Sequence, residues 1–183
     1  MLTVILNCYK RQEYLREQID FVNAQSLKPK KIIIWNNGKP LDPEIDFLQG
    51  ITVINSSENF GVWARFSIVP LAETEYICVM DDDVFPGCNF FKSSLEILAR
   101  EDCLVGGRGL RFLSHSSYAP FISYGWDSPN ESIQDVDIIG HIWLFRRESF
   151  VAFWRELPSP EIGRYSGEDM HLSYTFGKFR GLR

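Results

Sequence analysis

The feature that most constrains the fold is an apolar run that ends in three acids. Tyr76–Met80 is an uninterrupted run of strand-forming residues, and Asp81, Asp82 and Asp83 follow it without a break. Short continuous apolar runs are typical of strands that are buried on both faces of a parallel sheet. The sequence therefore predicts a central strand with carboxylates at its carboxyl end, which is the edge where open α/β sheets bind ligands.

The three adjacent carboxylates predict a metal site. Like charges in a row repel one another, and a hard divalent cation with oxygen ligands relieves that repulsion most directly. Because side chains alternate along an extended backbone, Asp81 and Asp83 are expected to point the same way. We therefore predict that Asp83 and Asp81 bind a divalent metal ion. The alternatives are a solvated acidic turn, or an Asp that caps the helix expected to begin near Cys88.

The rest of the chain alternates strand and helix patterns. Further strands are expected at residues 2–6, 32–35, 51–54, 104–107, 136–139 and 141–145. Helices are expected at residues 15–22, 59–70, 89–100, 148–157 and 167–179, with Asn59 capping the second of them. Residues 113–132 show no clear period and are expected to form a long loop, which in a compact domain is often functional. The pattern predicts one α/β domain with a mostly parallel central sheet flanked by helices.

Composition and charge narrow the class of protein. The 183 residues, 45% of them hydrophobic, fit a single globular domain. A net charge of -5 without a Lys/Arg run argues against a nucleic-acid partner, and no apolar segment reaches the length of a membrane span. The four cysteines show no paired metal-ligand spacing, so we expect reduced thiols and a cytoplasmic location.

Polar residues follow the other strands in the first half of the chain. Asn7 and Tyr9 end the first expected strand, and Asn36 and Asn37 end the second. In a doubly wound sheet these ends line one crevice, although Asn is also a common turn residue. Two cations, Arg11 and Arg65, are expected in helices near this edge. Either can bind a phosphate as a bidentate donor, or be an ordinary surface residue.

Two more acids stand at the start of the last expected helix. The buried stripe of that helix is defined by Leu172, Phe176 and Phe179. At about 100° per residue, Glu168 and Asp169 both fall within roughly 60° of this stripe. Inward-facing acids are costly unless a site uses them. The alternative is a capping box formed by Ser166 and Asp169.

Together these motifs resemble the GT-A class of nucleotide-sugar glycosyltransferases over nearly the whole chain. Asp81-Asp82-Asp83 is similar to the DxD-type metal motif, and residues 166–170 resemble the later Glu-Asp motif. Residues 33–37 resemble the exostosin strand that ends in Trp-Asn-Asn, and residues 59–66 and 140–147 resemble stretches of bacterial and viral transferases. The order and spacing of the motifs favour the family 2 and exostosin-like branches.

The resemblance implies a function and a set of site residues. It implies a metal-dependent enzyme that moves a hexosyl or deoxyhexosyl group from a nucleotide-diphosphate sugar, expected to be a UDP-sugar, to a carbohydrate or other hydroxyl acceptor. It also implies Mn²⁺ rather than Mg²⁺ as the ion. The residues expected to bind the donor are Asn7, Tyr9, Arg11, Asn36, Asn37, Asn59, Arg65, Asp81 and Asp82. Residues 1–110 or so would form the nucleotide-binding half, and residues 111–183 or so the acceptor side.

The acid pair and two aromatic residues complete the expected site. An inverting mechanism needs a carboxylate to take the proton of the acceptor hydroxyl. The resemblance assigns that role to Asp169, with Glu168 beside it. His141, Trp143 and the loop at residues 112–132 are expected to line the acceptor site. A retaining mechanism would need a different group near the opposite sugar face, and the sequence leaves this choice open.

The sequence departs from the family pattern in two places. Many family 2 enzymes carry an Asp after the second strand, where this chain has Asn36 and Asn37, so the base preference stays open. Exostosin-like transferases have membrane anchors and disulfides, and this chain shows neither pattern. The chain ends at Arg183 where another strand is expected, so we expect it to be part of a longer protein.

Two other classes of protein fit some of these features. A sugar-1-phosphate nucleotidyltransferase has a related sheet and uses a divalent metal, but it begins with a Gly-rich phosphate loop. The segment after the first strand, residues 7–11, contains no glycine. A non-catalytic metal- or sugar-binding module would explain the three acids but not the second, inward-facing pair.

Overall fold

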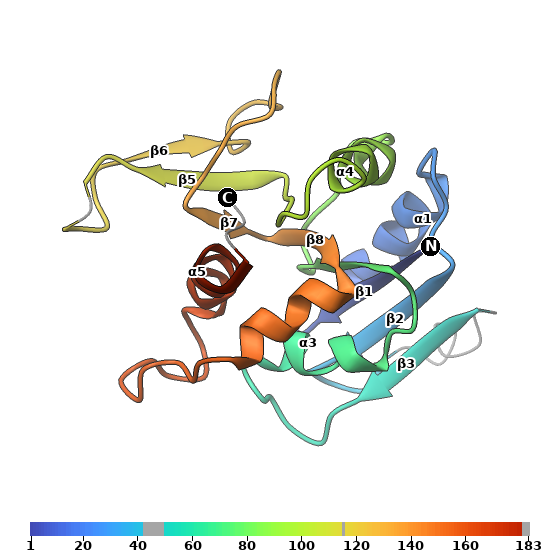
Figure 1. Cartoon of the computed structure of the whole chain (residues 1–183). Helices are drawn as coiled ribbons and strands as arrows, with labels where there is room; N and C mark the ends of the chain where they lie inside the picture. The colour runs from blue at the N-terminus through green and yellow to red at the C-terminus, as the bar shows by residue number, and fades with distance from the viewer. Residues whose placement is uncertain (42–49, 115, 181–183) are drawn as a thin grey trace.

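The computed structural model of the chain describes residues 1–41, 50–114 and 116–180. Its main sheet has five strands in the described residues, in the order β3-β2-β1-β4-β8 (Figure 1). These are β3 (Ile51–Asn55), β2 (Lys31–Asn36), β1 (Leu2–Cys8), β4 (Tyr76–Met80) and β8 (Ile142–Arg146). The first four are parallel to one another, and β8 runs antiparallel to β4. The predicted α/β class with a mostly parallel sheet is confirmed.

Helices cover both faces of this sheet. On one face lie α1 (Leu15–Ala24), which follows the short η1 (Gln12–Tyr14), and α4 (Phe90–Leu98). On the other lie α3 (Ala64–Ser67), η2 (Val69–Leu71), η3 (Arg147–Trp154) and α5 (Glu168–Arg180). Successive strand residues alternate between these layers, so that Val4 packs with the first set and Ile5 with the second. This burial on both faces explains the continuous apolar strands of the sequence.

A second, smaller sheet lies beside the first and has the strand order β6-β5-β7. It consists of β5 (Arg108–Phe112), β6 (Phe121–Tyr124) and β7 (Ile138–Gly140). The prediction of an unbroken loop over residues 113–132 was therefore wrong, because β6 pairs antiparallel with β5 inside it. Alternate residues of β6 are exposed, so the strand lacks an apolar run. The strand expected at 104–107 begins instead at Arg108, although Val105 forms an isolated bridge with Leu144.

Two of the predicted helices differ from the structure. The helix expected over residues 59–70 is reduced to α3 and η2, and Asn59 does not cap it, since the N-cap is Trp63. Gly61, with a φ of 81°, interrupts the helical path before α3 begins. The helix expected over residues 148–157 is a 3-10 helix at Arg147–Trp154.

The strand order places a crevice at one edge of the main sheet. From β1 the chain moves outward to β2 and β3, and then returns to the other side of β1 as β4. The carboxyl ends of β1 and β4 are neighbours, with Leu6 paired to Met80. Such a reversal of strand order is where open α/β sheets bind ligands. The three acids lie at this point, directly after β4.

None of the helices in the described ranges is both long and apolar enough to cross a membrane. All four cysteines are free thiols, as predicted.

Candidate active site

The acidic segment after β4 is held in place by backbone and side-chain hydrogen bonds. Gln18, buried on α1, donates from Nε2 to the carbonyl oxygens of Asp81 and Val84, at 2.7 and 3.1 Å. The backbone N–H of Asp81 donates to the carbonyl of His141, at 2.9 Å. Asp82 is buried, whereas Asp83 is exposed. The segment is therefore a fixed turn, and Gln18 is a supporting residue that the sequence analysis did not identify.

Asp81, Asp83 and His141 form a group that fits a divalent cation. Each offers one ligand atom, and these atoms lie within 4.8 Å of one another. The shared direction predicted for Asp81 and Asp83 thus agrees with the structure. Nδ1 of His141 is buried, lies 3.5 Å from Oδ2 of Asp81 and makes no hydrogen bond in the described part of the chain. A buried imidazole nitrogen without a partner, beside two carboxylates, is a suitable ligand set.

The backbone of His141 is unusual and helps to place this side chain. His141 lies between β7 and β8 and has a φ of 67°, a left-handed conformation that is uncommon outside glycine. Its pKa is lowered, mainly by burial and further by the nearby Arg108 guanidinium, which favours the neutral imidazole that a metal requires. His141 was predicted to line the acceptor site, and the structure places it with the acids.

Arg65 lies beneath the acids and not on the surface. Its side chain is 8% exposed and forms an ion pair with Asp81. Its Nη2 lies 3.9 Å from Oε1 of Glu168, and the guanidinium lies over the ring of Trp143 at 5.7 Å. Burial lowers the pKa of Arg65, and the surrounding carboxylates oppose that effect. The predicted phosphate contact is therefore corrected: Arg65 is a buried counter-charge that is already engaged.

Arg11 is the accessible cation of the acidic turn. Its Nη1 lies 2.7 Å from Oδ1 of Asp82 and 3.2 Å from Oδ2 of Asp83, while its side chain remains 49% exposed. The hydrogen bond to Asp82 is the main cause of a raised Arg11 pKa. Asp82 is thus a partner of Arg11, and it lies outside the metal group. The exposed side chain can therefore also meet an anion.

The acid pair of α5 faces the same region. Glu168 is 8% exposed, and Asp169 is half-buried. Burial raises the pKa of Glu168, and Arg65 counteracts this effect. Oδ1 of Asp169 accepts a hydrogen bond from the N–H of Met170, at 2.7 Å. Its Oδ2 lies 4.0 Å from the position of a Cβ built on Gly140, beside His141.

The capping-box alternative for Asp169 finds no support in these contacts. The Ser166 N–H donates to the Gly163 carbonyl, and the Ser166 carbonyl accepts from Nε1 of Trp63. No hydrogen bond joins the side chains or backbone of Ser166 and Asp169 among the described bonds of this segment. Asp169 therefore keeps one carboxylate oxygen directed toward the site.

The Asn residues predicted to bind the donor are used within the protein. Asn36 donates to the Lys39 carbonyl and to Oδ1 of Asn55, both at 2.8 Å. Asn37 donates to Oδ1 of Asn59 and to the Gly61 carbonyl, and accepts from the Phe60 N–H. These amides shape the loops after β2 and β3, so the turn-forming alternative describes them better. Asn7 is buried and Tyr9 half-buried at the end of β1, beside the acids.

Trp143 is a core residue. It is 1% exposed, donates from Nε1 to the Ile139 carbonyl at 2.7 Å, and packs edge-to-face against Phe66. The predicted place in an acceptor wall is therefore corrected: Trp143 lies behind the site, where it packs against Arg65. Trp143 lies on a strand among apolar and aromatic residues. The sequence alone could not distinguish a core tryptophan in this position from one that faces a ligand.

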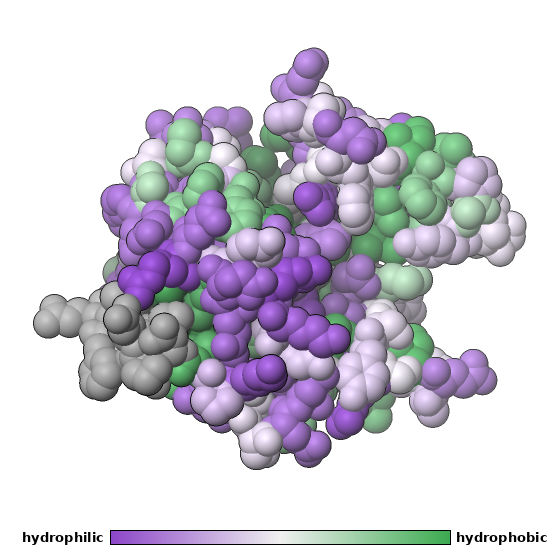
Figure 2. All heavy atoms as spheres, turned by 180° about the vertical axis from the view of Figure 1, so that it is seen from behind, coloured by the Kyte–Doolittle hydropathy of each residue, from purple (hydrophilic) through white to green (hydrophobic). Residues whose placement is uncertain are grey.

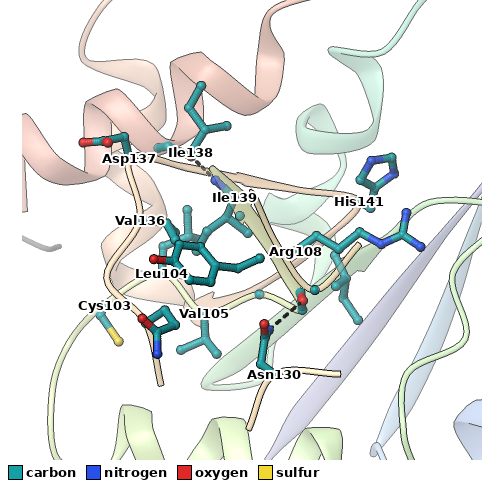
Figure 3. A pocket seen from close by; sticks show the side chains of 18 of the residues that line it. Cys103, Leu104, Val105, Arg108, Asn130, Val136, Asp137, Ile138, Ile139 and His141 are labelled. Carbon is teal, nitrogen blue, oxygen red and sulfur yellow. Dashed lines mark hydrogen bonds between the residues drawn. The ribbon is translucent and has the colours of Figure 1, made fainter. Parts of the chain in front are cut away.

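A large cavity opens beside the metal group. Its volume is about 1980 Å³, and it lies between α4, α5, β5, β7 and the segment that joins β6 to β7. In Figure 3, Arg108 and His141 lie at one end and the apolar side chains of Leu104, Val105 and Ile139 lie toward the other. Seen from behind, the surface is hollowed at its top between two lobes, with hydrophobic residues at the base (Figure 2). His141, Val84 and Gly167 line the cavity, so it lies next to the acids of both segments.

The model of glycosyl transferase family 2 matches residues 3–154. Three solved structures share the fold. TarS 1–349 from S. aureus has a TM-score of 0.63 and 13% identity, and the match covers 96% of this chain and 54% of that chain. Mannosyltransferase PcManGT from Pyrobaculum calidifontis, with GDP-Man and Mn²⁺, has a TM-score of 0.65 and 14% identity, with coverage of 100% and 53%. GalNAc-T7 with UDP, GalNAc and Mn²⁺ has a TM-score of 0.71 and 11% identity, with coverage of 96% and 40%.

The matches cover only part of the known structures. This chain spans 54% or less of the length of each of the three structures. No curated protein matches it in sequence. At these low identities the structures show the predicted GT-A fold, while the family model covers most of the chain. The chain belongs to glycosyl transferase family 2.

Proposed function

We propose that this chain transfers a glycosyl group from a nucleotide-diphosphate sugar, a UDP-sugar in particular, to a hydroxyl group of a saccharide, with Mn²⁺ as cofactor. The observation that carries the proposal is the convergence of Asp81, Asp83 and His141 at the reversal of strand order. Family membership supports the reaction class. The uridine nucleotides bound to GalNAc-T7 and to TarS support the choice of donor.

The residues present fit the proposed ion. Two carboxylates suit Mg²⁺ or Mn²⁺, and the imidazole nitrogen of His141 favours Mn²⁺, because Mg²⁺ prefers oxygen ligands. When bound, the cation would supply Lewis-acid stabilisation of the negative charge that develops on the departing diphosphate. The buried Nδ1 of His141, which makes no hydrogen bond to any described residue, is the structural sign that this group can take a further partner such as a metal ion.

The donor-binding role falls to residues around the ends of β1 and β4. Arg11, whose side chain is half-exposed, can donate charge-assisted hydrogen bonds to a phosphate while it holds Asp82 and Asp83. Tyr9 offers an aromatic ring at the end of β1, where a base can stack. The buried Arg65 balances the negative charges of Asp81 and Glu168.

Asp169 is the proposed general base. It stands at the amino end of α5, half-buried, with Oδ2 directed toward Gly140 and hence toward the metal group. The hydrogen bond from the Met170 N–H fixes the carboxylate through its other oxygen. A carboxylate held in this way can take the proton of an acceptor hydroxyl as the oxygen attacks the sugar. Glu168 is more deeply buried and already faces Arg65.

A donor panel tests this function. The protein is incubated with UDP-, GDP- and dTDP-sugars and Mn²⁺, and slow hydrolysis of each donor is followed by release of the nucleoside diphosphate. We expect hydrolysis of a UDP-sugar that chelation of the metal abolishes and that Asp83→Ala also abolishes. The exposed Asp20→Ala on α1 is the matched control. Formation of pyrophosphate from a nucleoside triphosphate and a sugar phosphate would indicate a nucleotidyltransferase instead. Saccharide binding without any turnover would indicate a binding module.

A further inference from the structure

An exposed tryptophan borders the metal group on the side away from β4. Trp126 follows β6 and is 48% exposed. Its ring centroid lies 5.0 Å from that of His141, in an edge-to-face arrangement with an interplanar angle of 86°. The guanidinium of Arg108 lies 4.9 Å from the same ring centroid. A large aromatic surface is thus kept partly open to solvent within contact distance of a proposed metal ligand.

The segment that carries Trp126 is fixed to the start of β5. Gly125 has a φ of 72°, and a Cβ there would lie 2.0 Å from the Gly107 carbonyl oxygen, so only glycine allows this close approach. Asn130 donates from Nδ2 to the same carbonyl oxygen, at 3.0 Å (Figure 3). The indole is therefore held at one place beside His141 and does not belong to a freely moving loop.

A polar hollow lies against this tryptophan. Its volume is about 320 Å³, at the lower end of the range typical of small-molecule sites. Besides Trp126, its lining includes carboxylates, hydroxyls and amides: Asp127, Glu131, Ser128, Ser132, Asn130 and Gln134. No Lys or Arg lines it among the described residues. Except for Ser123, every residue that lines this hollow, Trp126 included, also lines the larger cavity that reaches His141, so the hollow adjoins that cavity.

The chemistry of this hollow matches one class of ligand. A pyranose has an apolar face of C–H groups, which packs on an aromatic ring, and an edge of hydroxyls, which bind carboxylates and amides. The carboxylates disfavour an anionic ligand such as a phosphate or a uronic acid, because Arg108 and Arg111 lie over the rings of Trp126 and Tyr124 and do not line the hollow. We propose that Trp126 and the hollow formed by residues 123–134 are a subsite for a neutral sugar unit of the acceptor.

This inference rests on the proposed function, because it takes the group near His141 to be the site of transfer. The donor diphosphate is assigned to Arg11 and the acids at the ends of β1 and β4. Trp126 meets His141 from the β5–β7 side, where the acceptor would enter. Trp126 is thus a candidate specificity residue for the acceptor. It lies in the stretch at residues 112–132 that the sequence predicted to line the acceptor site, although the residue itself was not singled out.

The test measures saccharide binding directly and apart from turnover. Neutral oligosaccharides (gluco-, galacto-, manno- and xylo-configured) and an oligogalacturonate are titrated into the protein in the presence of Mn²⁺ and UDP. Binding is followed by intrinsic tryptophan fluorescence and by saturation-transfer NMR. The variants are Trp126→Ala, Trp126→Phe and, as a matched control, Trp154→Ala, which removes a tryptophan of similar exposure from η3. Circular dichroism confirms that each variant is folded.

We expect a neutral oligosaccharide to bind and the acidic one to bind at least about tenfold more weakly. Trp126→Ala should raise the saccharide dissociation constant about tenfold or more, Trp126→Phe should restore part of the loss, and Trp154→Ala should change nothing. The loss in saccharide affinity should exceed any loss in affinity for Mn²⁺–UDP.

Three results would overturn the subsite: unchanged saccharide affinity in Trp126→Ala, an equal loss in Trp154→Ala, or no saccharide binding to a wild-type protein that does hydrolyse a donor. Failure of the proposed function looks different. In that case no nucleotide sugar binds or is hydrolysed, whatever the saccharide titrations show. Should Trp126→Ala not fold, Asp127→Asn with the same readouts replaces it, and unchanged saccharide affinity there would likewise overturn the proposal.

Discussion

Nη2 of Arg65 lies 3.9 Å from Oε1 of Glu168, although the two residues stand on helices α3 and α5, far apart in the chain. Arg65 also pairs with Asp81, the first acid after β4. A single buried guanidinium therefore connects Asp81 of the proposed metal group with Glu168, the neighbour of the proposed base Asp169. Because a buried charge without a partner is costly, removal of Arg65 would destabilise both ends of this contact.

The first prediction concerns this buried cation. Arg65→Met keeps the length of the side chain but leaves Asp81 and Glu168 without their counter-charge. Breaking a buried pair in this way typically costs about 3–5 kcal/mol in the free energy of unfolding. Chemical denaturation in the presence of a chelator measures the loss. Arg11→Met removes the accessible cation from Asp82 and Asp83 of the same turn and should cost about 1 kcal/mol or less. Equal small losses in both variants would show that Arg65 is no structural counter-charge.

The second prediction concerns the metal ligands. Isothermal titration of UDP should show tighter binding with Mn²⁺ than without it. Asp83→Ala should abolish that gain, because it removes one of the converging carboxylates. His141→Ala should reduce the gain and narrow the difference between Mn²⁺ and Mg²⁺, since it deletes the nitrogen ligand. Chelation of the metal should return the wild type to the affinity of Asp83→Ala. Equal UDP affinity with and without Mn²⁺ in the wild type would refute the metal site.

The sequence best predicted the strands that are buried on both faces of the sheet. Strands β1, β2 and β4 are covered by helices on both faces, so they read as continuous apolar runs and were predicted nearly to their ends. Strand β6 belongs to a half-exposed hairpin with no such run, and it was missed. The helix expected over residues 59–70 is interrupted at Gly61, where the backbone closely approaches Arg164, more than a hundred residues later in the chain. A local sequence pattern cannot predict such a contact.

The residue types of the site were easier to predict than their roles. The acids after β4 and at the start of α5 stood out because carboxylates are unusual beside buried elements. Arg65 and His141 were identified as site residues, but their sequence context did not say that one is buried as a counter-charge and the other joins the acids. Asn36 and Asn37 were predicted to bind the donor, but their side-chain amides form hydrogen bonds within the protein. These contacts arise from the fold and cannot be predicted from the local sequence.

The third prediction uses the raised pKa of Glu168. Burial raises this pKa above its ordinary value of 4.5, while Arg65, Asp169 and His141 are the charged groups that act on it. An acid whose pKa is higher in the folded state binds more protons there, so its contribution to stability falls as pH rises from about 4.5 through the raised value. Glu168→Gln removes this dependence. In metal-free buffer, the variant should therefore gain stability relative to the wild type as pH increases across this window.

Denaturation curves at several pH values check this sign. The exposed Glu161→Gln on the loop before α5 serves as the control for the substitution itself. A stability difference between Glu168→Gln and the wild type that stays constant with pH, or that shrinks as pH rises, would contradict the proposed burial of the charged group.

The last prediction separates catalysis from helix capping at Asp169. Its Oδ1 accepts a bond from the Met170 N–H, and an amide oxygen can accept the same bond. Asp169→Asn should therefore lose about 1 kcal/mol or less of unfolding free energy and keep its affinity for Mn²⁺–UDP. The amide cannot take a proton, and loss of a general base typically lowers the rate by about 10²–10⁴. We thus expect transfer to a saccharide acceptor to fall at least about a hundredfold, with donor binding retained. Glu168→Gln should lower transfer less, because that carboxylate faces Arg65. Near wild-type transfer by Asp169→Asn would remove Asp169 as the base and make Glu168 the next candidate.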